Sequence, residues 1–212
     1  RVATLSAGTI RMDASNNITV SAANIKSDNK LTMVAGNNVD ISAITTGHSL
    51  NVNTGGNLNG KTGYFQQSSQ TNVGSNFTVG KDLVIVAKGD INSTGSTINV
   101  ANDAILKAAN VRIAAAKDSM LADVQTVGKN NVGRGMTSTE STTGGTVNTG
   151  NNLLVIATGT ATNQVDANGK VIAQQGTGNI TLEGAQLNAN KGQTALIANN
   201  NIDILNLNTN HS

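Results

Sequence analysis

The residues of this chain that could carry out acid–base or nucleophilic chemistry are few and scattered. Its two histidines stand in the pairs His48-Ser49 and His211-Ser212, which offer a general base beside a nucleophile. Each pair follows a strand-like segment at the same distance, nine residues after Val39 and after Ile202. The pairs therefore repeat with the sequence and are predicted to be turn residues. Neighbouring side chains on a strand point to opposite faces, so no catalytic residue is expected.

Carboxylates and basic residues give a second possible chemistry, the cleavage of acidic polysaccharides. Asp40, Arg112 and Asp203 each stand between two aliphatic residues, at equivalent positions of three separate repeats. We interpret them as residues of a solvated outer face. The alternative function, a polysaccharide-cleaving enzyme or a glycan-binding module, would need a carboxylate or Arg/Lys cluster along one flank.

Metal and cofactor sites have little support in the sequence. The chain has no cysteine, which excludes disulfides, thiolate metal sites and cysteine nucleophiles. The fragment Asp166–Gly169, DANG, is similar to the opening of a calcium loop, but the later acidic ligands of such a loop are missing. No metal and no cofactor is expected.

Four residues are candidates for lateral contact with a partner. Tyr64 and Phe65 are two of the three aromatic residues and lie in the polar stretch 60–76, which we interpret as a flap packed on the flank of the molecule. Lys129 and Arg134 could meet acidic glycans. They lie in 125–145, a stretch rich in Gly, Ser, Thr and Asn that predicts a mobile excursion.

Composition argues against several classes of protein. Aromatic residues make up 1% and charged residues 12% of the 212 residues, and the formal net charge is +2. Nucleic-acid binders usually concentrate basic residues and interleave aromatics, so no nucleic-acid partner is expected. The longest aliphatic runs, 83–87 and 153–157, are far shorter than the roughly 20 residues of a membrane span.

The repeated pattern of the sequence indicates the fold. Three related modules cover about 9–49, 76–119 and 146–212, and their strand-like segments start about twenty residues apart, as at Ile18 and Val39. Alternating aliphatic and polar residues indicate strands with one buried face, and Gly and Asn turn the chain. The sequence predicts an all-β fold, a single right-handed parallel β-helix of roughly eight to ten circuits, with Asn ladders at equivalent turns.

Insertions are expected near 60–76, 125–145 and 160–177. In the last of these, Asn168-Gly169 lies between two alternating segments, which predicts a β-hairpin with a type I′ turn that projects from the wall of the helix.

The motifs AGNNVDISA, KGDINSTGSTINV, AANVRIAAAKD and GNITLEGAQLNA resemble the repeats of filamentous haemagglutinin-type exoproteins of Gram-negative bacteria, which are secreted by the two-partner route. The resemblance implies a non-enzymatic shaft segment of a large adhesin or contact-dependent growth inhibition effector. It implies a secreted or cell-surface location and a partner in the target cell's surface or outer envelope. The outer-membrane transporter would serve the parent protein without binding this segment, which is expected to be monomeric.

Overall fold

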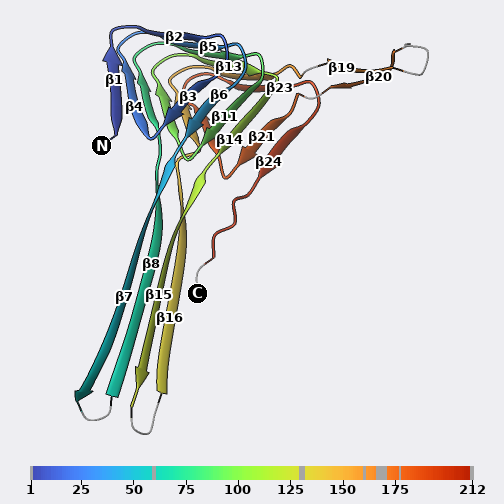
Figure 1. Cartoon of the computed structure of the whole chain (residues 1–212). Coiled ribbons are helices and arrows are strands. Elements are labelled where there is room, and N and C mark those ends of the chain that lie inside the picture. The colour runs from blue at the N-terminus through green and yellow to red at the C-terminus, as the bar shows by residue number, and fades with distance from the viewer. Residues whose placement is uncertain are drawn as a thin grey trace.

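The computed structural model of the chain describes residues 2–58, 61–128, 132–159, 161–165, 171–176 and 178–210. Throughout these ranges every regular element is a β-strand. Figure 1 shows a stack of strands at one end, a long narrow sheet that projects from it, and a short hairpin that leaves in another direction. The all-β prediction is confirmed.

The stack is built from three six-stranded sheets, here called sheets A, B and C. Sheet A contains β1 (Ala3–Ala7), β4 (Ala23–Ser27), β9 (Asn76–Val79), β12 (Thr97–Val100), β17 (Thr146–Thr149) and β22 (Gln186–Ala189). Sheet B contains β2 (Ile10–Ala14), β5 (Leu31–Ala35), β10 (Leu83–Ala87), β13 (Ala104–Ala108), β18 (Leu153–Ala157) and β23 (Thr194–Ala198). Sheet C contains β3 (Ile18–Ser21), β6 (Val39–Ser42), β11 (Asp90–Thr94), β14 (Asn110–Ala114), β21 (Ile180–Glu183) and β24 (Ile202–Leu205).

The chain visits sheets A, B and C in turn, and every pairing inside these sheets is parallel. Each visit to all three sheets is one circuit of a parallel β-helix, hereafter the solenoid. The repeat spacing seen in the sequence is the circuit itself, since Ile18 lies opposite Val39 and Ile91 lies opposite Val111. Each sheet has six strands, fewer than the eight to ten circuits expected, because long excursions take up part of the chain.

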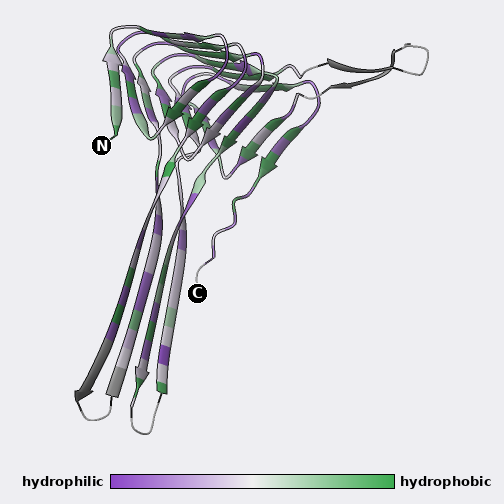
Figure 2. Ribbon diagram, in the orientation of Figure 1, coloured by the Kyte–Doolittle hydropathy of each residue, from purple (hydrophilic) through white to green (hydrophobic). Residues whose placement is uncertain are grey.

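Alternation along the strands builds the core. Figure 2 shows green and purple residues in turn along the solenoid strands, and the aliphatic set points inward. Val39, Ile41, Val111 and Ile113 are at most 1% exposed, as predicted. The same prediction is wrong for Ile202 and Ile204, which are 45% and 73% exposed. They lie on β24, the last strand of sheet C, so no further strand covers them.

Alanine fills the narrow corner between sheets B and C. The last residues of the sheet B strands are in register, and four of the six are buried, the two on the end strands being partly buried; they are Ala14, Ala35, Ala87, Ala108, Ala157 and Ala198. A methyl group leaves room for the chain to turn while the backbone of each circuit stays bonded to the next. Phe77 is the one aromatic side chain in the solenoid interior, and it is fully buried.

Two long hairpins leave the solenoid at the corner between sheets C and A. The first consists of β7 (Ile44–Leu58) and β8 (Lys61–Val73), and the second of β15 (Ala116–Val127) and β16 (Val132–Thr143). They combine into one antiparallel sheet of order β16-β15-β8-β7, hereafter the arm. A shorter hairpin, β19 (Ala161–Val165) and β20 (Val171–Gly176), leaves between sheets B and C (Figure 1).

The short hairpin confirms the strands predicted on either side of Asn168-Gly169, although that turn lies outside the described residues. The other two insertions differ from their predictions. Residues 125–145 are not a mobile excursion, because most of them form strands β15 and β16. The stretch 60–76 is not a flap on the flank, because its residues 61–73 form β8 in the middle of the arm.

The corner that carries the hairpins alternates between two structures. Circuits one, three and five turn there through a single residue with positive φ: Ala22 (45°), Gly95 (62°) and Gly184 (57°). Circuits two and four carry the two hairpins instead. Gly95 lies between their bases, where an added Cβ would come within 2.9 Å of the Ala43 Cβ and 2.7 Å of the Ala116 Cβ. Only glycine therefore fits at this corner between the two hairpins.

Replacement of Ile113 by Asp should destabilise the chain by more than about 3 kcal/mol, because a charge would enter a narrow apolar interior. Ile105→Asp is the matched control, since Ile105 is 37% exposed on β13 of the same circuit. Urea unfolding followed by circular dichroism measures both. Equal losses in the two variants would contradict an interior position for Ile113.

Removal of the arm should leave the solenoid folded. Deletion of residues 43–73 and 115–143 joins Ser42 to Gly74 and Ala114 to Gly144, which reproduces the tight corner Thr94-Gly95-Ser96 of the third circuit. The expected result is a single cooperative unfolding transition with an intact β-sheet spectrum, because the arm lies outside the three stacked sheets. Loss of cooperativity would mean that the arm is part of the core.

Candidate functional site

The arm is the part of the molecule that extends furthest from the solenoid (Figure 1). Its central junction joins the two hairpins, where β15 pairs with β8 from Ser119 opposite Gln70 to Val127 opposite Thr62. No turn connects these two strands, so side-by-side pairing of hairpins from two different repeats holds the arm together. The junction shows that a hairpin edge of this kind is complementary to another such edge.

A cluster of hydrogen bonds closes the base of the arm. The Asp118 carboxylate accepts hydrogen bonds from the Asn72 backbone N–H (2.6 Å), from Asn72 Nδ2 (2.9 Å) and from the Thr143 hydroxyl. Asn72 Nδ2 also donates to the Lys117 carbonyl oxygen at 2.6 Å. One side chain of β15 thereby ties together β8 and β16, one on each side of it.

These bonds lower the pKa of Asp118. Partial burial acts to raise this pKa, but the hydrogen bonds from Thr143 and Asn72 outweigh burial and hold the pKa below its ordinary value. Since the folded pKa is depressed, the stabilisation by the carboxylate is complete above the unfolded pKa and is lost as the pH falls through the folded one.

The two faces of the arm differ in character. On one, hereafter the apolar face, Leu50, Val52, Phe65, Ala122 and Val124 occupy neighbouring positions on β7, β8 and β15. Leu50 is 51%, Val52 38% and Val124 42% exposed. The opposite face is mainly polar. An antiparallel sheet usually packs its apolar face on a core, and among the described residues no element covers this one.

Three of the four predicted contact residues lie on the arm. Tyr64 and Phe65 are half-buried on β8, and the Tyr64 hydroxyl donates to Gln66 Oε1 at 2.8 Å. Arg134 lies on β16 and pairs with Asp123 at 2.9 Å, a hydrogen-bonded pair that lowers the pKa of Asp123 and raises that of Arg134. Lys129 lies outside the described residues. The structure therefore gives Arg134 an internal partner and places Phe65 on the apolar face.

The predicted role of the His-Ser pairs as turn residues is wrong for the first pair. His48 and Ser49 lie within strand β7, opposite Ser69 and Ser68 of β8. His48 follows Val39 by the same nine residues that separate His211 from Ile202. The first hairpin of the arm begins at Ile44, between Val39 and His48, so His48 lies on a hairpin strand and not at a turn of the solenoid. His211-Ser212 lies outside the described residues.

Asp40, Arg112 and Asp203 share one outward row of sheet C, separated by Asn92 and Thr181. The Asp40 carboxylate accepts a hydrogen bond from Asn92 Nδ2 at 3.0 Å, and Arg112 pairs with Glu183 at 2.6 Å. These side chains tie neighbouring circuits together on the outer face. Within the described ranges, no group of three or more His, Cys, Asp or Glu residues gathers as a metal site.

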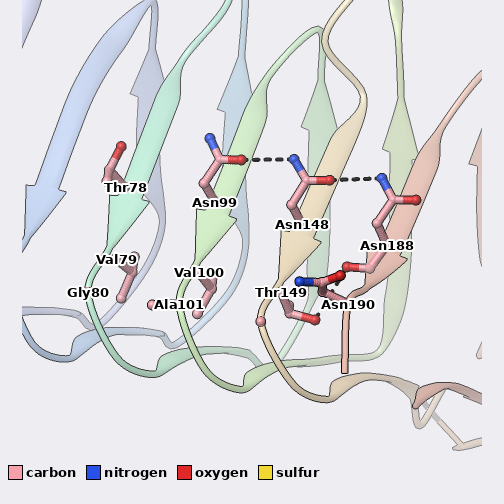
Figure 3. Close-up of a pocket in the computed structure, with 11 residues that line it drawn as sticks. Thr78, Val79, Gly80, Asn99, Val100, Ala101, Asn148, Thr149, Asn188 and Asn190 are labelled. Carbon is pink, nitrogen blue, oxygen red and sulfur yellow. Dashed lines mark hydrogen bonds between the residues drawn. The ribbon is translucent and has the colours of Figure 1, made fainter. Parts of the chain in front are cut away.

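A row of amides crosses the outer face of sheet A. Asn148 Nδ2 donates to Asn99 Oδ1, and Asn188 Nδ2 donates to Asn148 Oδ1, both at 2.8 Å (Figure 3). The row borders an open depression of about 570 Å³. Amide ladders were expected at turns, where Asn200 and Asn179 form one at 2.9 Å, but the longest ladder described lies on strands.

One surface was missed by sequence reasoning although its signal was present. The runs 83–87 and 153–157 are aliphatic at every position, and only alternate residues can point inward. Val84, Ile105 and Leu154 form an outward row of sheet B. An uninterrupted aliphatic run thus marked a strand with an apolar outer face as well as an apolar inner one.

Comparison with known proteins gave one match, to a family model described as a hemagglutinin repeat, over residues 58–152. The matched segment runs from the last residue of β7 to the residue before β18, so it contains two complete circuits and three arm strands. No curated protein and no solved structure was found to match the chain. No helix among the described residues is long and apolar enough to cross a membrane.

Replacement of Asp118 by Ala should loosen the arm and lower stability by about 1–3 kcal/mol, because the donors on Asn72 and Thr143 lose their acceptor. In thermal unfolding between pH 2 and 6, the difference from the unmodified chain should be largest above about pH 4 and should shrink as the pH falls through the lowered pKa of Asp118. Asp123→Ala breaks only the surface pair with Arg134 and should lower stability less, so it serves as the control for the size of the loss. A difference that stays constant with pH would refute the role of the carboxylate charge.

Proposed function

We propose, from the premise that residues 58–152 are a filamentous haemagglutinin-type repeat region, that this chain is a shaft segment of a large, adhesin-like exoprotein of a Gram-negative bacterium. Proteins with this repeat are secreted, and the segment would act at the cell surface by holding other parts of the protein at a distance. Its role is mechanical and interactive.

The observation that carries the proposal is the unbroken stack on all three sides of the solenoid. Sheets A, B and C each run through six strands, and the corners are bonded as well. At the corner between sheets C and A, the backbone N–H of Ala22 donates to the Ser42 carbonyl at 3.0 Å, and that of Gly95 donates to the Ala114 carbonyl at 2.8 Å. Hydrogen bonds between all neighbouring circuits resist bending, which a shaft requires.

The polar residues that might suggest catalysis have structural partners that fit this role. Asp40 is bonded to Asn92, Arg112 to Glu183 and Asp118 to Asn72. Each contact joins strands that are distant in sequence, and each contributes to the rigidity of the solenoid or the arm.

We further propose that the parent protein works in adhesion or in contact-dependent growth inhibition, where it would present a terminal adhesive or toxic element to a target cell. The arm supports a lateral contribution, since it projects from the shaft and carries an exposed apolar face. The partner would be a component of the target cell's surface or outer envelope.

A stiff shaft should hold its ends at a fixed distance. Thr19 and Asp203 lie in one row of sheet C, five inter-strand steps apart, or about 24 Å. Spin labels on Thr19→Cys and Asp203→Cys, in a chain that has no other cysteine, should give one narrow distance distribution by double electron–electron resonance. A broad distribution would contradict the proposed shaft.

The competing function is tested by incubating the chain with acidic and neutral polysaccharides, with and without calcium. The shaft predicts no release of new reducing or unsaturated ends. Release that disappears on Asp40→Asn or Asp203→Asn would favour the polysaccharide-cleaving enzyme.

A further inference from the structure

The segment that follows β24 lies against the edge of β16 (Figure 1). Residues 206–210 leave the solenoid after Leu205 and reach Glu140 of β16. The backbone N–H of Glu140 donates to the Asn210 carbonyl at 3.2 Å, and the backbone N–H of Asn210 donates to Glu140 Oε2 at 2.8 Å. The first of these bonds is of the kind that joins two β-strands, so it marks the edge of β16 as a surface that accepts a strand.

One half of this contact is equivalent to a residue of the β8–β15 junction. In the junction, Gln70 of β8 lies opposite Ser119 of β15. Glu140 follows Gln70 by 70 residues, the same offset that separates the repeated segments 76–87 and 146–157. Glu140 therefore holds the place in the second hairpin that Gln70 holds in the first.

The other half is equivalent as well, because Leu207 corresponds to Ala116. Leu207 is the second residue after β24, as Ala116, the first residue of β15, is the second after β14. A Cβ added to Gly184 would lie 2.7 Å from the Leu207 Cβ, and one added to Gly95 would lie 2.7 Å from the Ala116 Cβ. Leu207 therefore occupies, beside the tight corner of the fifth circuit, the place that Ala116 occupies beside the tight corner of the third.

The two equivalences give one register. Asn210 follows Leu207 by three residues, as Ser119 follows the first residue of β15. The contact between Glu140 and Asn210 is thus the counterpart of the pair that Ser119 makes in the junction. A segment that touched β16 at random would not reproduce a register set by two other repeats.

We propose that Leu207 begins a further arm strand, which docks on the edge of β16 as β15 docks on β8. The partner of this edge is the first strand of the hairpin that follows the sixth circuit of the same chain. The second and fourth circuits carry the two hairpins of the arm, so the arm gains one hairpin for every two circuits. The proposal goes beyond the role of a shaft, because it makes the arm a second sheet that lengthens with the solenoid.

Glu140 makes the edge selective for that strand. A charged side chain on an edge strand opposes the addition of an unrelated strand. The Glu140 carboxylate pairs with Lys117 Nζ at 3.2 Å and also accepts a hydrogen bond from the backbone N–H of Asn210. The charge that would repel another chain is thereby engaged by contacts within this one.

Two cysteines test the register in the chain as it stands. If Glu140 lies opposite Asn210, then Ser141 lies opposite Thr209. Ser141→Cys combined with Thr209→Cys should form a disulfide under mild oxidation, because directly opposed Cα atoms lie about 4.5–5.5 Å apart. Ser141→Cys combined with Asn208→Cys is the matched control and should remain reduced, since neighbouring side chains on a strand point to opposite faces. Equal disulfide formation in the two variants would mean that the segment has no fixed register on β16.

An added hairpin tests the docking itself. In the extended chain, a copy of residues 116–143 replaces residues 207–212, so that a copy of β15 follows the sixth circuit. The control chain carries the same copy with proline at the two positions equivalent to Leu121 and Asp123. Proline cannot donate a backbone hydrogen bond, and these positions share with Ser119 the side of the strand that would face β16.

Amide hydrogen exchange measured by NMR reports the docking. The N–H groups of Arg134 and Met136 point to the same side of β16 as that of Glu140, away from β15, because alternate groups on a strand point the same way. Relative to the unmodified chain, their exchange should slow at least about tenfold in the extended chain and not in the control chain. The N–H of Thr137 points toward β15, so its slow exchange in both chains shows that the arm is folded.

Two results of this exchange experiment would overturn the proposal: no change at Arg134 and Met136 in the extended chain, or equal slowing in the control chain. Slowing that appears only at high protein concentration would overturn it too, because the edge would then be occupied by a second copy of the chain.

Discussion

The spacing between hydrogen-bonded strands, about 4.8 Å, governs the rest of this structure. In the solenoid every interior side chain lies directly above its counterpart in the circuit below, so an aromatic ring would have to fit between equally wide neighbours. Small aliphatic residues fill such rows without strain. Phe77 is the one aromatic side chain in these rows, and it lies in sheet A between Ile25 and Ile98. At the corners the same spacing brings backbones so close that a Cβ on Gly74 or Gly144 would lie 2.0–2.1 Å from atoms of Gly95.

The arm depends on this spacing as well. A two-stranded hairpin is as wide as two circuits are tall, and the hairpins leave from circuits two and four. Each hairpin therefore reaches the next one at the distance of a normal strand pair, and β8 meets β15 without distortion. The tight corner at Gly95 occupies the circuit between them, and Asp118 secures the junction where the two hairpins leave the solenoid.

Sequence alone predicted the parts of the fold that follow from local rules. The circuit length was visible because Ile18 and Val39, or Ile91 and Val111, head equivalent segments, and the short hairpin was visible because Asn168-Gly169 is a turn signal. Strands β15 and β16 were missed because neither face of the arm is buried. Without burial, Gly, Ser and Thr residues show no alternation, and the β8 residues that pair with β15 lie 49 to 65 positions earlier in the chain, from Gln70 opposite Ser119 to Thr62 opposite Val127. The environment of the contact residues was mispredicted for the same reason. Arg134 was interpreted as a basic residue of a mobile loop, but it lies on β16 and its side chain pairs with Asp123 on the neighbouring strand β15.

The match between hairpin width and circuit height also limits how such a chain can evolve. The segment 76–87, which contains β9 and β10, recurs at 146–157 as β17 and β18, an offset of 70 residues. A duplication or deletion of one such unit adds or removes two circuits together with two arm strands, so both sheets stay continuous. Loss of a single circuit would bring two hairpins into the same space, and gain of one would leave a gap one strand wide. Insertions and deletions that survive selection are therefore expected to add or remove whole units of two circuits and one hairpin.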